Sequence, residues 1–311
     1  VSMGANYPDV SWQKTTMKNI GLDFYLLSDR ISGSFDFFRN DITRLLGYAS
    51  TSPLAIYETR PINGGHYYRR GWELMVDTKN LVGEFTWDTS LTFSKTNSFW
   101  KERLPNYDYQ IYQQRENEPM SAYYYYNVTG IINTDRSNMP ESQKTLQAEA
   151  QLPGCPIIED KNKDGKIDEN DVYMKDNSPA IYVGIGNTFT YKRFEFSFFM
   201  YGQFGIQKYN IAYSAAQAGP LAVDYPENSN KFAYRLWNSQ TNPNGSRPGL
   251  AIGKMGSLPG NAWVNADREN ASFMRMRNIT LAYNLAGNIL GSLQRYVRNI
   301  KVYVDAQNPF I

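Results

Sequence analysis

The feature that most constrains this chain is an alternation of apolar and polar side chains, in runs joined by connections of unequal length. In residues 19–26, apolar side chains at even positions alternate with mostly polar side chains at odd positions. The same pattern returns in residues 31–38, after a turn at residues 28–30. Because successive side chains of a strand point to opposite faces, this segment predicts a hairpin with one apolar and one mostly polar face.

The hairpin pattern recurs along the chain. Further strands are predicted at residues 72–77, 85–93, 181–190, 194–200, 279–283 and 300–304. Short turns near residues 80–83 and at Lys192-Arg193 join two of these pairs. The sequence therefore predicts an all-β protein with about eight antiparallel strands in four hairpins.

Between the hairpins the predicted connections are long, at residues 48–68, 100–178 and 206–270. Compact soluble domains seldom contain such loops, whereas outer-membrane barrels combine short periplasmic turns with long extracellular loops. A soluble β-sandwich also shows alternation, so alternation alone leaves both folds open. The 24 Tyr, 16 Phe and 6 Trp residues, which suit a barrel's aromatic girdles, favour a transmembrane β-barrel segment.

Composition excludes several other classes. The net charge of +2, from 32 basic and 30 acidic residues, gives no electrostatic case for nucleic-acid binding. Cys155 is the only cysteine, so no internal disulfide can form, and His66, the only histidine, follows the Gly-rich segment 63–65, where we expect a loop. No phosphate-binding loop, dinucleotide fingerprint, zinc spacing or marked acid–base pair of carboxylates occurs, and we do not expect an enzyme.

Several strings resemble one family of transporters. They are YPDVSWQKTT at 7–16 running into NIGLDF at 19–24, RGWEL at 70–74, DKNKDGKIDEND at 160–171 followed by PAIYVGIGN at 179–187, YKRFEFSFFMYGQFG at 191–205, FMRMRNITLAY at 273–283 and VYVDAQN at 302–308. In this order and spacing they resemble the C-terminal barrel portion of SusC-like TonB-dependent outer-membrane transporters. The resemblance covers nearly the whole chain.

The resemblance implies a partial barrel domain over residues 1–311, cut from a larger barrel that a plug closes. We expect the plug, the TonB box and the last strands to lie outside this chain. The implied function is import of a glycan or peptide nutrient across the outer membrane of a Gram-negative bacterium. The implied partners are a SusD-like surface lipoprotein, the TonB complex, reached through the missing N-terminal part, and outer-membrane lipid.

One loop matches a calcium-binding pattern. Ca²⁺ requires several oxygen ligands at once, which the side chains of Asp160, Asn162 and Asp164 and the carbonyl of Lys166 can supply. Gly165 permits the sharp turn, and the twelfth position is Asp171 rather than the usual Glu. We expect a structural calcium ion here; the alternative is a solvated turn without metal.

Tyrosines are concentrated in the longest predicted loop. Tyr107, Tyr109 and Tyr112 precede the run Tyr123, Tyr124, Tyr125 and Tyr126. Exposed aromatic rings stack on sugar faces, so residues 123–126 are candidates for substrate binding. Alternatively these rings pack in the loop's own core or against a partner lid.

Two other functions remain open at this stage, namely a secreted carbohydrate-binding β-protein or adhesin, and a glycoside hydrolase on a β-scaffold. Both would bury apolar positions such as Leu22, Phe35, Trp87 and Phe198 between layers. A barrel would expose them on the outside of a curved sheet. The hydrolase would also need two close carboxylates in a cleft.

Overall fold

The computed structural model describes residues 9–50, 59–105, 109–113, 117–178, 181–212, 231–250, 252, 255–286, 291, 295–297 and 299–310. The chain forms two compact units. Unit 1 comprises residues 1–107, 178–206 and 271–311, and unit 2 comprises residues 108–177 and 207–270. No helix among the described residues is long and apolar enough to cross a membrane.

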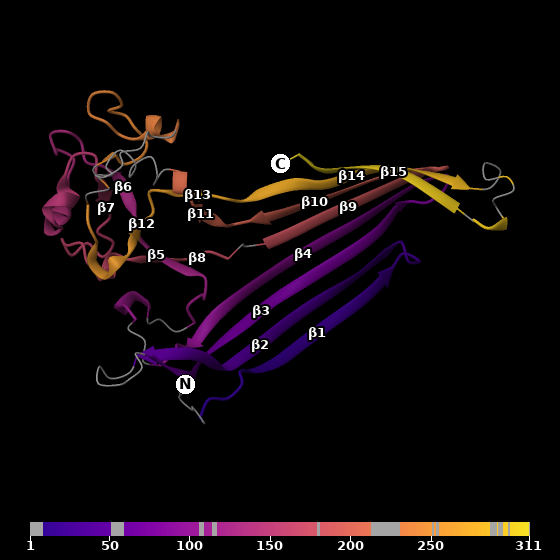
Figure 1. Ribbon diagram of the computed structural model, residues 1–311, viewed down its shortest axis with the longest axis horizontal. Helices are drawn as coiled ribbons and strands as arrows, with labels where there is room; N and C mark the ends of the chain where they lie inside the picture. Colours follow the sequence, from indigo (N-terminus) through magenta and orange to yellow (C-terminus); the bar gives the residue numbers. More distant parts are fainter. Residues whose placement is uncertain are drawn as a thin grey trace, which may run out of the picture. The chain divides into compact units, whose positions relative to one another are not determined.

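Unit 1 is one antiparallel sheet of eight strands, seen side by side in Figure 1. In spatial order they are β1 (Lys14–Leu26), β2 (Ile31–Ser50), β3 (Thr59–Leu81), β4 (Phe85–Glu102), β9 (Ile181–Tyr191), β10 (Phe194–Phe204), β14 (Phe273–Ala286) and β15 (Asn299–Phe310). Each strand pairs with its neighbours in sequence order, apart from the strands inserted in unit 2. The eight predicted strands and the all-β fold class are confirmed.

The register confirms that the sheet has two chemically different faces. On the apolar face, one rung across five strands holds Leu22, Phe35, Leu74, Phe93 and Val183. Another rung on that face holds Trp87, Phe189, Phe196, Leu281 and Val304. On the polar face, the rung one residue along holds Asp88, Thr188, Ser197, Thr280 and Asp305. The period-two pattern therefore places apolar and polar residues on opposite sides of the sheet.

Short connections lie together at one end of the strands, which we call the short-turn rim. The turn after β1 places Leu27, Ser28 and Asp29 at positive φ, and the turn between β9 and β10 places Lys192 at φ 56°. Pairing of Ile31 with Thr78 brings the turns at 27–30 and 82–84 to the same edge. Pairing of Tyr191 with both Phe85 and Phe194 brings the turn at 192–193 there as well. The predicted short turns thus share one rim.

The predicted loop at 48–68 is largely wrong. Strand β2 continues to Ser50 and β3 begins at Thr59, so only residues 51–58, which lie outside the described residues, separate them. His66 consequently lies within β3 rather than in a turn, and its Nε2 is 3.2 Å from Oδ1 of Asp41 on β2. Glycines at 64 and 65 hid this strand, because glycine weakens strand propensity without preventing pairing.

Unit 2 contains most of the two longest predicted loops. Its strands are β5 (Ala122–Tyr126), β6 (Val128–Ile131), β7 (Pro156–Ile158), β8 (Tyr173–Asp176), β11 (Gln207–Tyr209), β12 (Trp263–Val264) and β13 (Arg268–Asn270). They form the sheets β12-β5-β8, β6-β7 and β11-β13. Short 3-10 helices, among them η1 (Ile111–Gln113), η4 (Glu169–Asp171) and η8 (Pro259–Asn261), lie between them.

A hydrophobic core holds unit 2 together. Tyr126, Ile132, Ile158 and Val172 from the first insertion are almost completely buried. Met255, Leu258 and Ala262 from the second insertion complete the same core. The two long connections are therefore not independent loops, because each supplies part of the apolar surface that the other buries.

Candidate functional site

The first candidate site is an aromatic cavity of about 580 Å³ within unit 2. Residues from both insertions line it, namely Tyr112, Gln113, Tyr123, Tyr124, Tyr125, Tyr209, Ile211, Asn261, Ala262, Trp263, Val264 and Arg268. Trp263 is 75% exposed. Large aromatic side chains that are grouped and exposed to solvent often mark a binding site, and aromatic-lined cavities of this size are typical of ligand sites.

Strand β5 supplies the central tyrosines of the aromatic cavity. The rings of Tyr123 and Tyr125 stack with centroids 5.1 Å apart, and Tyr125 stacks on Tyr173 of β8 at 5.7 Å. Tyr124, on the other face of the strand, packs against Tyr112 at 5.0 Å. Burial raises the pKa of Tyr112 and of Tyr125 above the ordinary phenol value, so both hydroxyls remain protonated and able to donate.

A fixed cation lies beside these rings. The guanidinium carbon of Arg268 is 3.5 Å from the ring centroid of Tyr123. Arg268 also donates from Nη2 to Oδ1 of Asn177 at 2.9 Å and to the carbonyl of Gln207 at 3.0 Å. Tyr123 donates its hydroxyl proton to Oε1 of Gln207 at 2.8 Å. These contacts hold the positive charge and the stacked tyrosines in one arrangement, which lowers the cost of ordering them around a ligand.

Of the four tyrosines predicted to bind substrate, the structure brings three to the aromatic cavity. Tyr126 is fully buried, and its hydroxyl donates to the carbonyls of Asp168 and Pro259. Its prediction as a substrate contact is corrected: it is a core residue, the alternative that the sequence left open. Tyr112 lines the cavity, and Tyr107 lies outside the described residues.

Sequence reasoning missed Trp263, Arg268 and Tyr209 in the second insertion. Trp263 reaches the aromatic cavity because β12 pairs in parallel with β5, through Trp263 with Tyr125 and Val264 with Tyr126. Tyr209 and Arg268 are register partners in the separate β11-β13 sheet. These pairings join segments far apart in the chain, and strands of two or three residues are too short to show a period. No local sequence signal marks these residues.

The predicted calcium loop folds tightly around its own side chains. The N–H of Gly165 donates to Oδ2 of Asp160 at 2.8 Å, and the N–H of Asp164 donates to Oδ1 of Asp160 at 3.2 Å. The N–H of Lys166 donates to Oδ1 of Asp164 at 3.0 Å. Gly165 has a φ of +84°, which explains the glycine at this position. Asp160, Asn162 and Asp164 thus lie together as the motif requires.

Asp171 has a different neighbourhood. Its Oδ1 accepts from the N–H of Lys161 at 2.9 Å, and its Oδ2 accepts from the N–H of Asp168 at 2.8 Å. The second bond is half of a capping box that begins η4. In the described part of the chain, no three His, Cys, Asp or Glu side chains are grouped to hold a metal ion. Asp171 thus stabilises the local fold, as Asp160 and Asp164 do through the backbone N–H groups that they accept from. The predicted ligand set of Asp160, Asn162, Asp164, Asp171 and the carbonyl of Lys166 stays a prediction.

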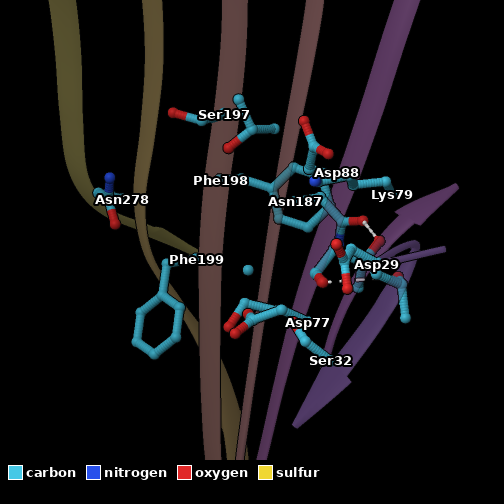
Figure 2. Close-up of a pocket in the computed structure, with 15 residues that line it drawn as sticks. Asp29, Ser32, Asp77, Lys79, Asp88, Asn187, Ser197, Phe198, Phe199 and Asn278 are labelled. Carbon is cyan, nitrogen blue, oxygen red and sulfur yellow. Dashed lines mark hydrogen bonds between the residues drawn. The ribbon is translucent and has the colours of Figure 1, made fainter. Parts of the chain in front are cut away.

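A second candidate site lies on unit 1. It is a pocket of about 360 Å³. Figure 2 shows the side chains from several neighbouring strands that line it, including Ser32, Asp77, Asp88, Ser197 and Asn278. Carboxylates and hydroxyls dominate these residues, and no described group of carboxylates is placed as a metal site. The pocket can hold water and hydrogen-bond a polar solute, as expected of the wall of a hydrated lumen.

Comparisons with known proteins agree with this architecture. The chain is 24% identical to TonB-dependent receptor P3 of Formosa agariphila, over 96% of this chain and 30% of that protein. It is 27% identical to the TonB-dependent receptor SusC of Bacteroides thetaiotaomicron, over 97% of this chain and 29% of that protein. The chain is a relative of the SusC-like TonB-dependent receptors. It spans about 30% of the length of these curated relatives.

Solved structures of similar fold are transporters. The chain matches the RagAB peptide importer in its closed-closed state with a TM-score of 0.71 and 17% identity, over 99% of this chain and 33% of that one. A second RagAB peptide transporter structure matches with a TM-score of 0.69. No family model matches the sequence. The predicted transmembrane β-barrel fold and outer-membrane location are confirmed, and the relatives are named as receptors and transporters rather than enzymes.

Proposed function

We propose that this chain forms part of the barrel wall and an aromatic cargo-binding unit of a TonB-dependent importer. The observation that carries the proposal is the exposed apolar face of the eight-stranded sheet, where Leu22 is 63%, Phe35 39% and Trp87 36% exposed. A sandwich or a soluble binding protein would bury these side chains between layers. Lipid covers such a face in a barrel and leaves the opposite, polar face for the lumen.

The cargo is a glycan or a peptide, and the aromatic cavity of unit 2 contacts it. Stacked tyrosines and the exposed Trp263 offer ring faces to sugars or to apolar peptide side chains. Arg268 adds one fixed positive charge for a carboxylate or a carbonyl oxygen. Two of the structural neighbours are described as peptide importers or transporters, which is why peptides are tested alongside glycans.

A surface lipoprotein of the SusD kind and the TonB complex complete the proposed importer. The proposal for both partners rests on similarity to the TonB-dependent receptor SusC and to the RagAB peptide importer. Co-purification of the full-length receptor, tagged and expressed in its own host, tests the lipoprotein. Uptake in a host lacking TonB tests the energy source, because a TonB-dependent importer loses uptake there while it retains surface binding.

Uptake of labelled oligosaccharides and oligopeptides by cells carrying the full-length receptor tests the function directly. We expect uptake of one cargo class, and we expect Trp263→Ala and Tyr123→Ala each to reduce surface binding by about tenfold, as loss of a stacked aromatic contact does in other sites. Tyr234→Ala, at an exposed tyrosine of unit 2 that does not line the aromatic cavity, is the matched control. Unchanged uptake in cells that lack the receptor would contradict the proposal that the receptor imports the cargo.

Cysteine labelling of intact cells tests the orientation. Trp263→Cys in unit 2 should react with a membrane-impermeant maleimide, whereas Lys192→Cys at the short-turn rim should not. The background is low because the native Cys155 is fully buried. Reaction of Lys192→Cys from outside would reverse the assigned sides.

A further inference from the structure

A row of basic side chains crosses the apolar face of the sheet, between two rungs that carry aromatic rings. Register pairs Lys18 with Arg39 and Arg39 with Arg70 across β1, β2 and β3. The adjacent rung, two residues along each strand, holds Ile20, Phe37 and Trp72. Because alternate residues share a face, the three cations point to the same side as the aromatic rings. We define Lys18, Arg39 and Arg70 as the basic row.

The basic row has an excess of positive charge. On this face of β1–β4, from the basic row to the strand ends and including the flanking Lys14 and Lys95, two carboxylates, Asp41 and Glu102, lie among the cations. Among the described residues, Lys18 and Arg70 form no ion pair, and both are exposed. On the same face of β9, β10, β14 and β15, none of the residues paired with a neighbouring strand is charged. The positive charge is therefore confined to one sector of the sheet.

Packing fixes the two arginines in place. The guanidinium carbon of Arg39 is 4.2 Å from the ring centroid of Tyr68, and that of Arg70 is 5.1 Å from the centroid of Phe99. The two rings stack on each other with centroids 5.4 Å apart. Arg39 donates to the carboxylate of Asp41 from Nε at 2.9 Å and from Nη2 at 3.0 Å. Both guanidinium groups are thus oriented before any ligand arrives, and guanidinium groups match phosphate oxygens in geometry.

We propose that the basic row binds the phosphate group of a membrane lipid at the outer rim of the barrel. The inference rests on the proposed function, since it needs the apolar face to lie in a bilayer. Aromatic girdles mark the depth of lipid headgroups, and the basic row lies between the rung of Phe37 and Trp72 and the rung of Tyr68 and Phe99, each about 6–7 Å away along the strand. Anionic headgroups at that depth attract exposed Lys and Arg. A binding site for a protein partner would not require the basic row to lie at the depth of the aromatic rings.

Lipid titration of the full-length receptor tests this inference. Native mass spectrometry would measure binding of phosphorylated lipid A and of its dephosphorylated form to the purified receptor. We expect the wild-type receptor to prefer the phosphorylated lipid by about tenfold or more, and K18Q plus R70Q to abolish the preference. R69Q is the matched control, because Arg69 is the neighbouring exposed cation on the opposite face of β3.

Each remaining outcome decides the proposal. Retention of the preference in K18Q plus R70Q overturns it, as does complete displacement of lipid A by millimolar inorganic phosphate, which would show a site for the free anion. Uptake and outer-membrane fractionation of the same variants separate the two proposals. A receptor that inserts and imports without a lipid preference refutes only the basic row's role. A wild-type receptor that does not insert refutes the proposed function, and the lipid site with it.

Discussion

The apolar face of unit 1 and the core of unit 2 contain similar apolar residues, but the first exposes them and the second buries them. Phe35, Leu281 and Val304 remain exposed on the sheet, whereas Ile132, Ile158 and Val172 in unit 2 are almost completely buried. In the first region the protein offers an apolar surface to something outside the chain. In the second it buries that surface within itself. Hydrophobicity alone therefore says little about stability until the medium that covers each side chain is known.

The strongest way to break this comparison is to make the same truncation in both regions. Ile158→Ala should destabilise unit 2 by about 2–5 kcal/mol, because close-packed neighbours leave a cavity. Ile279→Ala, on the apolar face of β14, should cost less than about 2 kcal/mol, because fluid lipid fills the space. Hydrogen exchange of the full-length receptor in lipid vesicles would measure local opening of each region. Equal losses of stability would show that close-packed protein, and not lipid, surrounds both side chains.

The second test introduces a charge on each face of β10. Phe198→Arg should destabilise the barrel by about 2–4 kcal/mol if that residue lies near the bilayer midplane, since the charge loses its hydration. Ser197→Arg, on the polar face, should cost far less because water remains available there. Folding titrations in lipid vesicles give both values. Tolerance of Arg at position 198 combined with a penalty at 197 would reverse the assigned faces.

The third test concerns the loop at residues 160–171 in unit 2. Calcium binding stays a prediction, and calorimetric titration of the full-length receptor should show heat that Asp160→Ala plus Asp164→Ala removes. Asp171→Ala should instead lower the stability of unit 2 by about 1 kcal/mol with or without calcium, because it removes half of the capping box that begins η4. Identical heats in the wild-type receptor and the double variant would leave only a turn without metal.

The two regions also differ in how far the sequence could predict them. The eight strands of unit 1 were predictable because a period of two is local, and the register bears it out from Leu22 to Val304. Unit 2 was not, because its core and its aromatic cavity depend on contacts such as Trp263 with Tyr125, between segments that show no common period. Tyr126 illustrates the limit: its neighbours at 123–125 line the cavity, and only the fold shows that its ring is buried.

The smallest expected effect is the most selective test of what covers the apolar face. Phe198 is half-buried on the apolar face, and its ring lies beside those of Phe189 and Phe196, with centroids 6.4 and 6.2 Å away. Phe198→Leu should therefore cost under about 1 kcal/mol, because lipid adapts to a new shape whereas a protein core resists both cavities and changed shapes. Folding titrations in vesicles of two acyl-chain lengths would measure it. A loss of several kcal/mol from this aliphatic replacement would mean that a rigid protein surface, and not lipid, packs against β10.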